Sequence, residues 1–386
     1  MSTRHTPPIY TPLSQSSIRV LELFPGPTGS EIHGNLIELS LNNKFSGGYE
    51  ALSYMWGAQE ATSTIFLGGK PFAIRLNLSA ALEALRSSGR LRKIWIDAIC
   101  INQTDVAERN AQVSIMSRVY QQAGTVLVWL GEEDKQTVEL FDFILDTEGW
   151  TKGRVDEHGG SMSLSNHSSS GDESDFEVEE EQTSYPEFWL DFLGVCSNPY
   201  WRRVWIVQEI LSSSAVKLLC GASSISLKDF MVPHAALRER LFMTGESRQT
   251  MDEIMKSSAY LIVRAYKYRD EGFTLGSLLK LVSSCDSRCQ DPRDKIYGVL
   301  SLARDVHGIR PDYGKSLLEL YFDIMKEGTA GCLYIDGLQG YLKPYSELDD
   351  LCILPNLRKI PSAAMRDNSY AKQLVLSLIR VGSEIL

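Results

Sequence analysis

The stretch NPYWRRVWIVQEIL, residues 198–211, carries one acidic side chain among aromatic and aliphatic ones. Helical spacing of four residues places Glu209 in line with two tryptophans, one of which is Trp205. A carboxylate in such surroundings is costly to bury unless a partner neutralises it or a ligand uses it. We therefore expect Glu209 either to form an ion pair with Arg202 or Arg203, or to act on a ligand.

Polar side chains also accompany two predicted strands. The first strand is closed by Ser53, Tyr54, Trp56 and Gly57, and the apolar run 93–102 contains Asp97 and ends at Asn102. In open α/β sheets, ligands bind outside the carboxyl ends of the strands, so these side chains are expected to face one crevice. Asp97 and Asn102 could equally serve only to cap the loop before the next helix. Glu209 is expected at the edge of the same crevice, within reach of Ser53, Tyr54 or Trp56.

Standard catalytic and metal-binding signatures are missing from the chain. It has no GxGxxG, GxxxxGK[ST], HExxH or GxSxG motif. None of the six histidines lies near the candidate residues, which argues against a Ser-His or Cys-His nucleophile. The seven cysteines are scattered among apolar neighbours, and no second pair completes a zinc site beside Cys285 and Cys289. We expect reduced thiols, no metal and a cytoplasmic location.

Strands and helices alternate in the part of the chain that contains the candidate residues. Strands are predicted near 49–55, 93–99, 125–130 and 215–220. Helices between them are predicted at 77–89, at 105–124 with Asp105 as N-cap, and from Pro199 with Asn198 as N-cap. Gly68-Gly69 predicts the turn of a short hairpin. This order predicts an α/β fold with one mostly parallel sheet flanked by helices.

The region after residue 225 is predicted to be helical. Amphipathic or capped segments occur at 251–270, at 291–303 with Asp291 as N-cap, and at 316–328 with a Ser316–Glu319 capping box. These segments predict a helical subdomain added to the C-terminal side of the sheet.

Composition divides the chain further. Residues 156–187 hold ten Asp or Glu and no Lys or Arg, which predicts a disordered acidic insertion. The net charge of −10 comes from this insertion, so the neutral remainder predicts no nucleic-acid binding. No apolar run is long enough to span a membrane. The predicted domains are an N-terminal segment with short strands (1–48), an α/β core that includes the insertion (49–225), the helical subdomain (226–330) and an unassigned tail (331–386).

Four motif blocks in order make the chain resemble a known family. The blocks are YEALSYMWG, KIWIDAICINQTDVAERNAQVSIMSRVYQQAGTVLVWLG, NPYWRRVWIVQEI and DPRDKIYGVLSLA followed by IRPDYGKS. Together they resemble the HET (heterokaryon incompatibility) domain of filamentous fungi. The resemblance implies a role in nonself recognition, in which fusion of incompatible hyphae triggers programmed cell death. It also implies self-association or other incompatibility proteins as partners.

A second, more distant resemblance is to TIR domains, which have a flavodoxin-like fold. The segments LSYMWG and WRRVWIVQE stand where TIR domains have their first strand and a Trp followed by a Glu on a helix. The resemblance assigns the NAD-cleaving role of that Glu to Glu209, with Trp56 or Trp205 stacking on a ring. Nicotinamide leaves NAD as a neutral molecule, so one carboxylate that stabilises the oxocarbenium-like transition state is enough.

Two functions follow, and both stay open at this point. The chain is either a cell-death effector that hydrolyses NAD as substrate, with Glu209 catalytic and no bound cofactor, or a non-enzymatic signalling and oligomerisation module of the same pathway.

Overall fold

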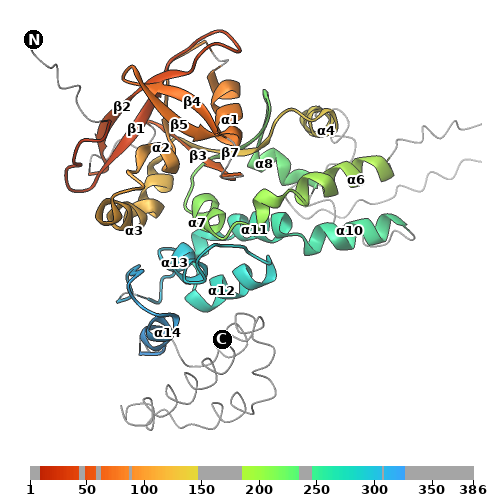
Figure 1. Cartoon of the computed structure of the whole chain (residues 1–386). Coiled ribbons are helices and arrows are strands. Elements are labelled where there is room, and N and C mark those ends of the chain that lie inside the picture. The colour runs from red at the N-terminus through yellow and green to blue at the C-terminus, as the bar shows by residue number, and fades with distance from the viewer. Residues whose placement is uncertain are drawn as a thin grey trace, which may run out of the picture. The chain divides into compact units, whose positions relative to one another are not determined.

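The three-dimensional arrangement comes from a computed structural model of the whole chain, shown in Figure 1. The structure describes residues 9–42, 48–57, 62–86, 89–146, 185–233, 246–306 and 308–326. Contacts divide the chain into two units, Met1–Gly331 and Cys332–Leu386. The second unit, and with it the predicted tail 331–386, lies outside the described residues.

A nine-stranded sheet forms the centre of the first unit (Figure 1). In spatial order its strands are β5 (Lys70–Arg75), β4 (Thr62–Leu67), β2 (His33–Ser40), β1 (Ser17–Leu23), β6 (Arg92–Trp95), β3 (Glu50–Tyr54), β7 (Thr125–Gly131), β8 (Val216–Cys220) and β9 (Ser223–Ser226).

The four predicted strands are confirmed as neighbours in one sheet. They are β6, β3, β7 and β8, and each pairs in parallel with the next, as the helical crossovers between them require. The whole sheet is mixed, because β1–β2, β1–β6, β4–β5 and β8–β9 are antiparallel. The α/β class is therefore confirmed, and the parallel part is limited to the centre of the sheet and the β2–β4 pair.

The hairpin predicted at Gly68-Gly69 is also confirmed. Leu67 pairs with Lys70 across the turn, and both glycines have positive φ angles of 58° and 77°. Two consecutive residues with positive φ make the turn whose twist matches antiparallel strands, and glycine adopts it without strain.

Fourteen helical segments are named among the described residues. They are α1 (Leu76–Arg86), α2 (Asp97–Cys100), α3 (Val106–Gln122), α4 (Lys135–Leu145), α6 (Tyr185–Cys196), the 3₁₀ turn η1 (Pro199–Arg202), α7 (Trp205–Leu211), α8 (Leu227–Phe230), α10 (Glu246–Lys256), α11 (Ser258–Lys267), the 3₁₀ turn η2 (Arg269–Glu271), α12 (Leu275–Ser284), α13 (Asp294–Leu300) and α14 (Leu317–Lys326).

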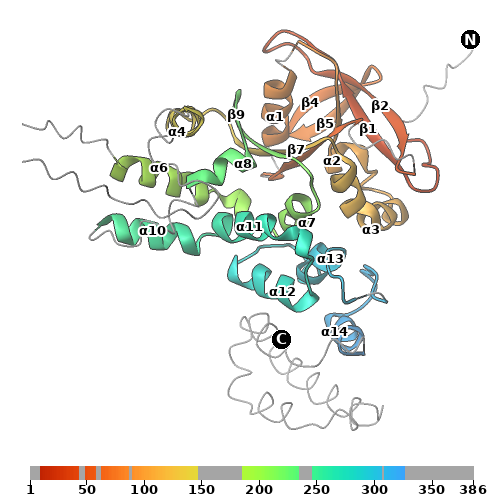
Figure 2. The ribbon, with the colours of Figure 1, turned by 180° about the vertical axis from the view of Figure 1, so that it is seen from behind.

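Helices cover both faces of the central strands. One face of β3 and β7 packs with Leu78, Leu82 and other apolar side chains of α1. On the opposite face, Tyr120 of α3 packs against Trp95, with ring centroids 5.4 Å apart. The helix α7 contacts α3 on this second side, and α11 and α13 contact α7 in turn. Figure 2 shows the arrangement from behind, with α4 and α8 beside β9. The alternation of side chains along β3 thus sends Leu52 toward α1 and Ser53 toward α7.

Three predicted elements have different bounds in the structure. The run 93–102 is not one strand, because β6 ends at Trp95 and Asp97–Cys100 form the short helix α2. The predicted helix from Pro199 is divided into η1 and α7, so Trp201 and Glu209 do not share one helix. The segment 251–270 is likewise two helices, α10 and α11, because the Ser257 side chain caps the second one. Apolar periodicity reports which side chains are buried and does not report where the backbone turns.

Most predicted caps are confirmed. The Asp105 side chain accepts a hydrogen bond from the Glu108 amide at the start of α3. Ser316 and Glu319 form both bonds of a capping box at α14. The prediction for Asp291 was wrong, because α13 begins only at Asp294 and the Asp291 carboxylate binds the side chain of Arg293.

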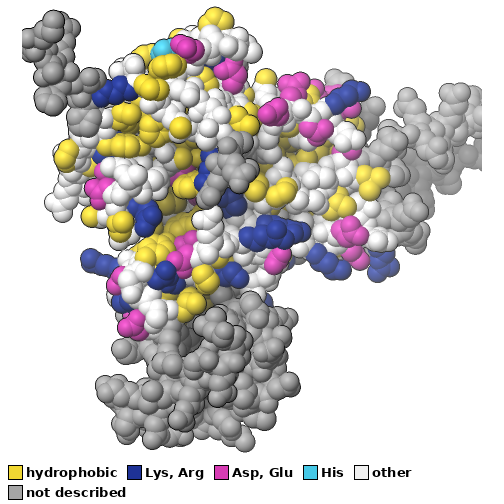
Figure 3. Space-filling model, viewed as in Figure 1, with side chains coloured by type: hydrophobic (Ala, Val, Ile, Leu, Met, Phe, Trp, Pro, Cys, Tyr) yellow, Lys and Arg dark blue, Asp and Glu magenta, His cyan; other side chains and the backbone are white. Residues whose placement is uncertain are grey.

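Other predictions fall partly or wholly outside the described residues. Residues 156–184, most of the predicted acidic insertion, lie outside the described residues, and residues 185–187 begin α6. The described residues from 246 onward contain helices and no named strand, while the domain boundaries at 48, 225 and 330 remain predictions. Within the described part of the chain, no helix is long and apolar enough to cross a membrane. Figure 3 shows acidic and basic side chains interspersed with apolar ones on one face of the molecule.

Candidate functional site

Glu209 lies between the sheet and the helices that cover it. Its side chain is 2% exposed, and both carboxylate oxygens have a partner. Oε2 accepts a hydrogen bond from the hydroxyl of Ser53 on β3. Oε1 lies 3.7 Å from Nη2 of Arg203, in the linker between η1 and α7. The predicted proximity of Glu209 and Ser53 is therefore confirmed.

The predicted position of Glu209 at the edge of a crevice was wrong. The neighbouring Val207 and Ile210 side chains are fully buried, so this face of α7 packs in the core. Glu209 forms an ion pair with Arg203, which is one of the two arginines predicted from the sequence as its partner. One terminal nitrogen of Arg203, Nη1, is buried and has no hydrogen-bond partner among the described residues.

Asp97 and Trp56 form a second polar pair at the carboxyl ends of β3 and β6. Trp56 Nε1 donates a hydrogen bond to Asp97 Oδ2 over 2.9 Å. The Tyr54 hydroxyl lies close enough to Asp97 to influence its pKa, and the backbone amide of Ala98 donates to the other Asp97 oxygen over 2.7 Å. Asp97 is half-buried, as is Trp56, so this pair lies closer to solvent than Glu209 does.

Arg203 connects the two carboxyl groups electrostatically. Burial raises the pKa of Glu209 above its usual value, although Arg203 and the Ser53 hydrogen bond act in the opposite direction. Burial raises the pKa of Asp97 as well, again against the effect of Arg203. Burial alone would lower the pKa of Arg203, but Glu209 and Asp97 together raise it. The site thus contains one cation for two carboxyl groups, and we refer to Asp97, Arg203 and Glu209 as the charge cluster.

The structure brings together five of the eight predicted residues: Ser53, Tyr54, Trp56, Asp97 and Glu209. Gly57 follows directly, with a positive φ of 73° that suits glycine, and its carbonyl accepts a hydrogen bond from Arg75. The turn after β3 therefore explains Gly57 without a ligand.

Asn102 and Trp205 are engaged elsewhere. The Asn102 side-chain oxygen accepts hydrogen bonds from the amide and hydroxyl of Thr104, which is the loop-capping role considered from the sequence. Trp205 packs on Gly298 of α13, where an added Cβ would lie 3.6 Å from the indole, and it lies close enough to Asp294 to influence the pKa of that carboxyl. Trp205 thus joins α7 to α13, and its contacts are not with the charge cluster.

Two residues of the site were not anticipated from the sequence. The Tyr200 hydroxyl lies 2.5 Å from Ser53 Oγ and completes the hydrogen bonds around that hydroxyl. The Arg75 guanidinium lies over the Trp56 ring, 5.0 Å from its centroid, and so occupies one face of the indole. Neither contact has a local sequence signal, because each joins residues that are brought together only by the fold.

The chemical capacity of the site follows from these groups. Its carboxyl groups could stabilise a cation or exchange a proton, and Trp56 could stack on a planar group if Arg75 moved. In the described part of the chain, no group of three or more His, Cys, Asp or Glu side chains could hold a metal ion.

Comparison with known proteins agrees with the motif blocks. Residues 49–209 match the family model described as "Heterokaryon incompatibility protein (HET)". Residues 49–209 form a HET domain. The matched range begins at the residue before β3 and ends at Glu209, so this HET domain contains all eight predicted site residues.

A similar protein is found in Neurospora crassa. The chain is 28% identical over 311 residues to "Heterokaryon incompatibility protein 6, OR allele". The matched region covers 69% of this chain and 45% of the relative, so the chain corresponds to less than half of that protein. No solved structure gives a significant match.

Proposed function

We propose that this chain acts in fungal heterokaryon incompatibility, as a cell-death effector that signals through its HET domain without consuming NAD. The HET match and the similarity to an incompatibility protein support the pathway. The burial of Glu209 supports the mechanism. A side chain that is 2% exposed, with one oxygen bound by Ser53 and the other facing Arg203, has no free oxygen for a substrate.

In this proposal the charge cluster is structural. It joins β3, the start of α2 and the η1–α7 segment, which are distant in the sequence. Buried polar networks of this kind fix one arrangement of the elements, because any other leaves a charge without a partner. The HET domain then acts by presenting a surface to a second copy or to another incompatibility protein.

NAD hydrolysis is the second candidate. It is favoured by the convergence of Ser53, Tyr54, Trp56 and Asp97 around Glu209 at the carboxyl ends of the parallel strands. Two carboxyl groups with raised pKa values also fit the pattern of functional sites. For this candidate the site must open, so that Arg203 leaves Glu209 and Arg75 leaves the ring of Trp56. The chemistry would then be the one that the resemblance to TIR domains implies.

One experiment separates the two candidates. Purified full-length protein and its Glu209→Gln variant are incubated with millimolar NAD, and free nicotinamide is measured beside the melting temperature. The same two proteins, with Glu139→Gln as an exposed control, are expressed in a fungal host to score growth. The signalling proposal expects no nicotinamide, and growth arrest that survives Glu209→Gln.

Release of nicotinamide would instead establish NAD hydrolysis as the activity. Nicotinamide release by the wild-type protein, lost by orders of magnitude in Glu209→Gln at an unchanged melting temperature, would overturn the signalling mechanism. Growth arrest without nicotinamide would overturn the enzymatic one.

A further inference from the structure

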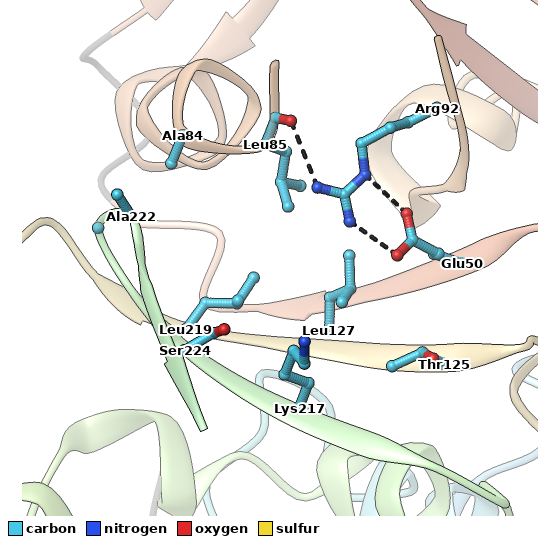
Figure 4. Close-up of a pocket in the computed structure, with 11 residues that line it drawn as sticks. Glu50, Ala84, Leu85, Arg92, Thr125, Leu127, Lys217, Leu219, Ala222 and Ser224 are labelled. Atoms are coloured by element: carbon cyan, nitrogen blue, oxygen red, sulfur yellow. Dashed lines mark hydrogen bonds and ion pairs between the residues drawn. The ribbon is translucent and has the colours of Figure 1, made fainter. Parts of the chain in front are cut away.

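A pocket of about 230 Å³ lies on the face of the sheet that α1 covers (Figure 4). Its floor is formed by β3, β7, β8 and β9, and one wall by the C-terminal turn of α1. Leu52 and Leu127 on this face pack toward α1, whereas Ser53 points to the other side. The pocket is therefore separate from the charge cluster around Glu209.

The pocket has an apolar part that fits a small ring or a short aliphatic group. Leu85 of α1, Leu127 of β7 and Leu219 of β8 line it together. An apolar cavity of about 150 Å³ is large enough for benzene. A volume of about 230 Å³ thus leaves room for a ring of that size and one attached polar group.

The polar part of the pocket carries one uncompensated positive charge. Arg92 and Glu50 neutralise each other through two N–H···O bonds of 2.7 Å, and Arg92 Nη1 also donates to the Leu85 carbonyl. Figure 4 shows this pair above the sheet, on the side where Lys217 and Leu127 rise from adjacent strands. The Lys217 ammonium group has no ion pair or hydrogen bond with any residue that the structure describes.

Lys217 is an exposed residue of β8, and its place in the sheet puts it beside the apolar part of the pocket. It is the register partner of Leu127 and lies two residues before Leu219 on the same face of β8. Its methylene stem can pack along these leucines while the ammonium group reaches the pocket. Ser224, the register partner of Leu219 on β9, adds a hydroxyl to the same lining.

We propose that this pocket binds a small organic monoanion, a carboxylate on an apolar body. The carboxylate pairs with Lys217 and accepts a hydrogen bond from the Ser224 hydroxyl, and the apolar body packs on Leu85, Leu127 and Leu219. A single charge is specified because Lys217 is the one cation of the lining that Glu50 does not already neutralise. The ligand site is independent of the function proposed for Glu209.

The test uses benzoate and benzamide, which have nearly the same shape and differ in charge. Their dissociation constants for the full-length protein are measured by ligand-observed NMR titration at low ionic strength. Benzoate is expected to bind roughly fivefold more tightly than benzamide, the ratio that a partly exposed ion pair supplies. Lys217→Gln should remove this preference, and Lys217→Arg should keep it.

Two further variants complete the design. Lys217→Glu should reverse the preference, so that benzylamine binds more tightly than benzoate. Lys228→Gln, an exposed lysine on α8 outside the lining, should leave the benzoate preference unchanged. The proposal is overturned if benzoate and benzamide bind equally, if neither binds, or if Lys217→Gln retains the preference at an unchanged melting temperature.

Discussion

At the scale of single residues, the site is governed by the ratio of one cation to two carboxyl groups. Arg203 faces both Glu209 and Asp97, and the pKa of each carboxyl group is raised by burial. The buried Glu209 and the half-buried Asp97 cannot both be fully neutralised by one guanidinium. The cluster is therefore expected to depend far more on Arg203 than on either acid alone.

The first prediction compares neutral variants of the charge cluster. Arg203→Gln should lower the free energy of unfolding at pH 7 by about 3 kcal/mol, because two carboxyl groups lose their cation. Glu209→Gln should change it by less than about 1 kcal/mol, because Asp97 still acts electrostatically on Arg203 and the amide can still accept from Ser53. Urea unfolding at equilibrium measures both.

Arg202→Gln is the matched control, because Arg202 is adjacent in sequence and 47% exposed. It should change the free energy of unfolding by no more than about 0.5 kcal/mol. Equal losses in Arg203→Gln and Glu209→Gln would mean that Asp97 does not share the cation.

The second prediction concerns pH. Because the pKa of Glu209 is raised in the folded state, the folded protein binds more protons than the unfolded chain just above the usual glutamate pKa. This contribution to stability is fully present below the unfolded pKa and is lost as pH rises through the raised folded value. Unfolding free energies measured from pH 4 to pH 8 should therefore fall less steeply in Glu209→Gln than in the wild type. Parallel profiles for the two proteins would refute the raised pKa.

At the scale of elements, the junction between η1 and α7 places Arg203 and Glu209 on the same side of the sheet. Asn198 fixes the start of η1, before this junction, with both ends of its amide. Its oxygen accepts from the Tyr200 amide over 2.9 Å and caps η1, and its nitrogen donates to the Leu130 carbonyl at the end of β7 over 2.9 Å. One side chain thus sets both the start of the turn and its position on the sheet.

The third prediction separates these two contacts. Asn198→Asp keeps the capping oxygen and loses the donor to Leu130, so it should cost about 1 kcal/mol. Asn198→Ala loses both and should cost about 2 kcal/mol. Thermal and urea unfolding monitored by tryptophan fluorescence would rank the stabilities of the wild type and the two variants. An alanine variant that is as stable as the aspartate variant would show that the cap contributes nothing.

At the scale of the first unit, a second buried ion pair connects the N-terminal strands to the helices. Arg19 on β1 donates to both carboxylate oxygens of Glu108 on α3, at 2.5 and 2.9 Å. It also donates to the carbonyls of Thr11 and Cys100, and its side chain is 3% exposed. Glu108 therefore has a long-range partner in place of the capping-box bond that its position after Asp105 predicts.

The fourth prediction tests this connection. Glu108→Gln should lower the free energy of unfolding by about 3 kcal/mol, because Arg19 is left as a buried cation without a carboxylate. Glu139→Gln is the control, since Glu139 pairs with Lys135 on the exposed surface of α4 and should matter by no more than about 0.5 kcal/mol. The double variant Arg19→Met with Glu108→Met should recover part of the loss. An unchanged free energy of unfolding in Glu108→Gln would contradict the stabilising role of the Arg19–Glu108 ion pair.

The sequence by itself determined the elements whose causes are local. The four central strands, the Gly68-Gly69 turn and the caps at Asp105 and Asn198 were all predicted, because apolar spacing, turn residues and capping side chains act within a few positions. The motif blocks also predicted the HET domain that the family model matches. The convergence of Ser53, Tyr54, Trp56 and Asp97 followed from their common place at strand ends.

Only the tertiary structure decided what surrounds those residues. Three features depend on segments that lie far apart in the chain: the burial of Glu209, the contact between Tyr200 and Ser53, and the position of Arg75 over Trp56. Short strands were predicted in residues 1–48, but the antiparallel pairing of β1 with β2 was not, because strand pairing depends on which edges meet in space. A local pattern specifies which side chains must be buried, whereas their partners depend on how the whole chain packs. The partners in turn decide whether a buried carboxylate binds a ligand or forms an ion pair with an arginine.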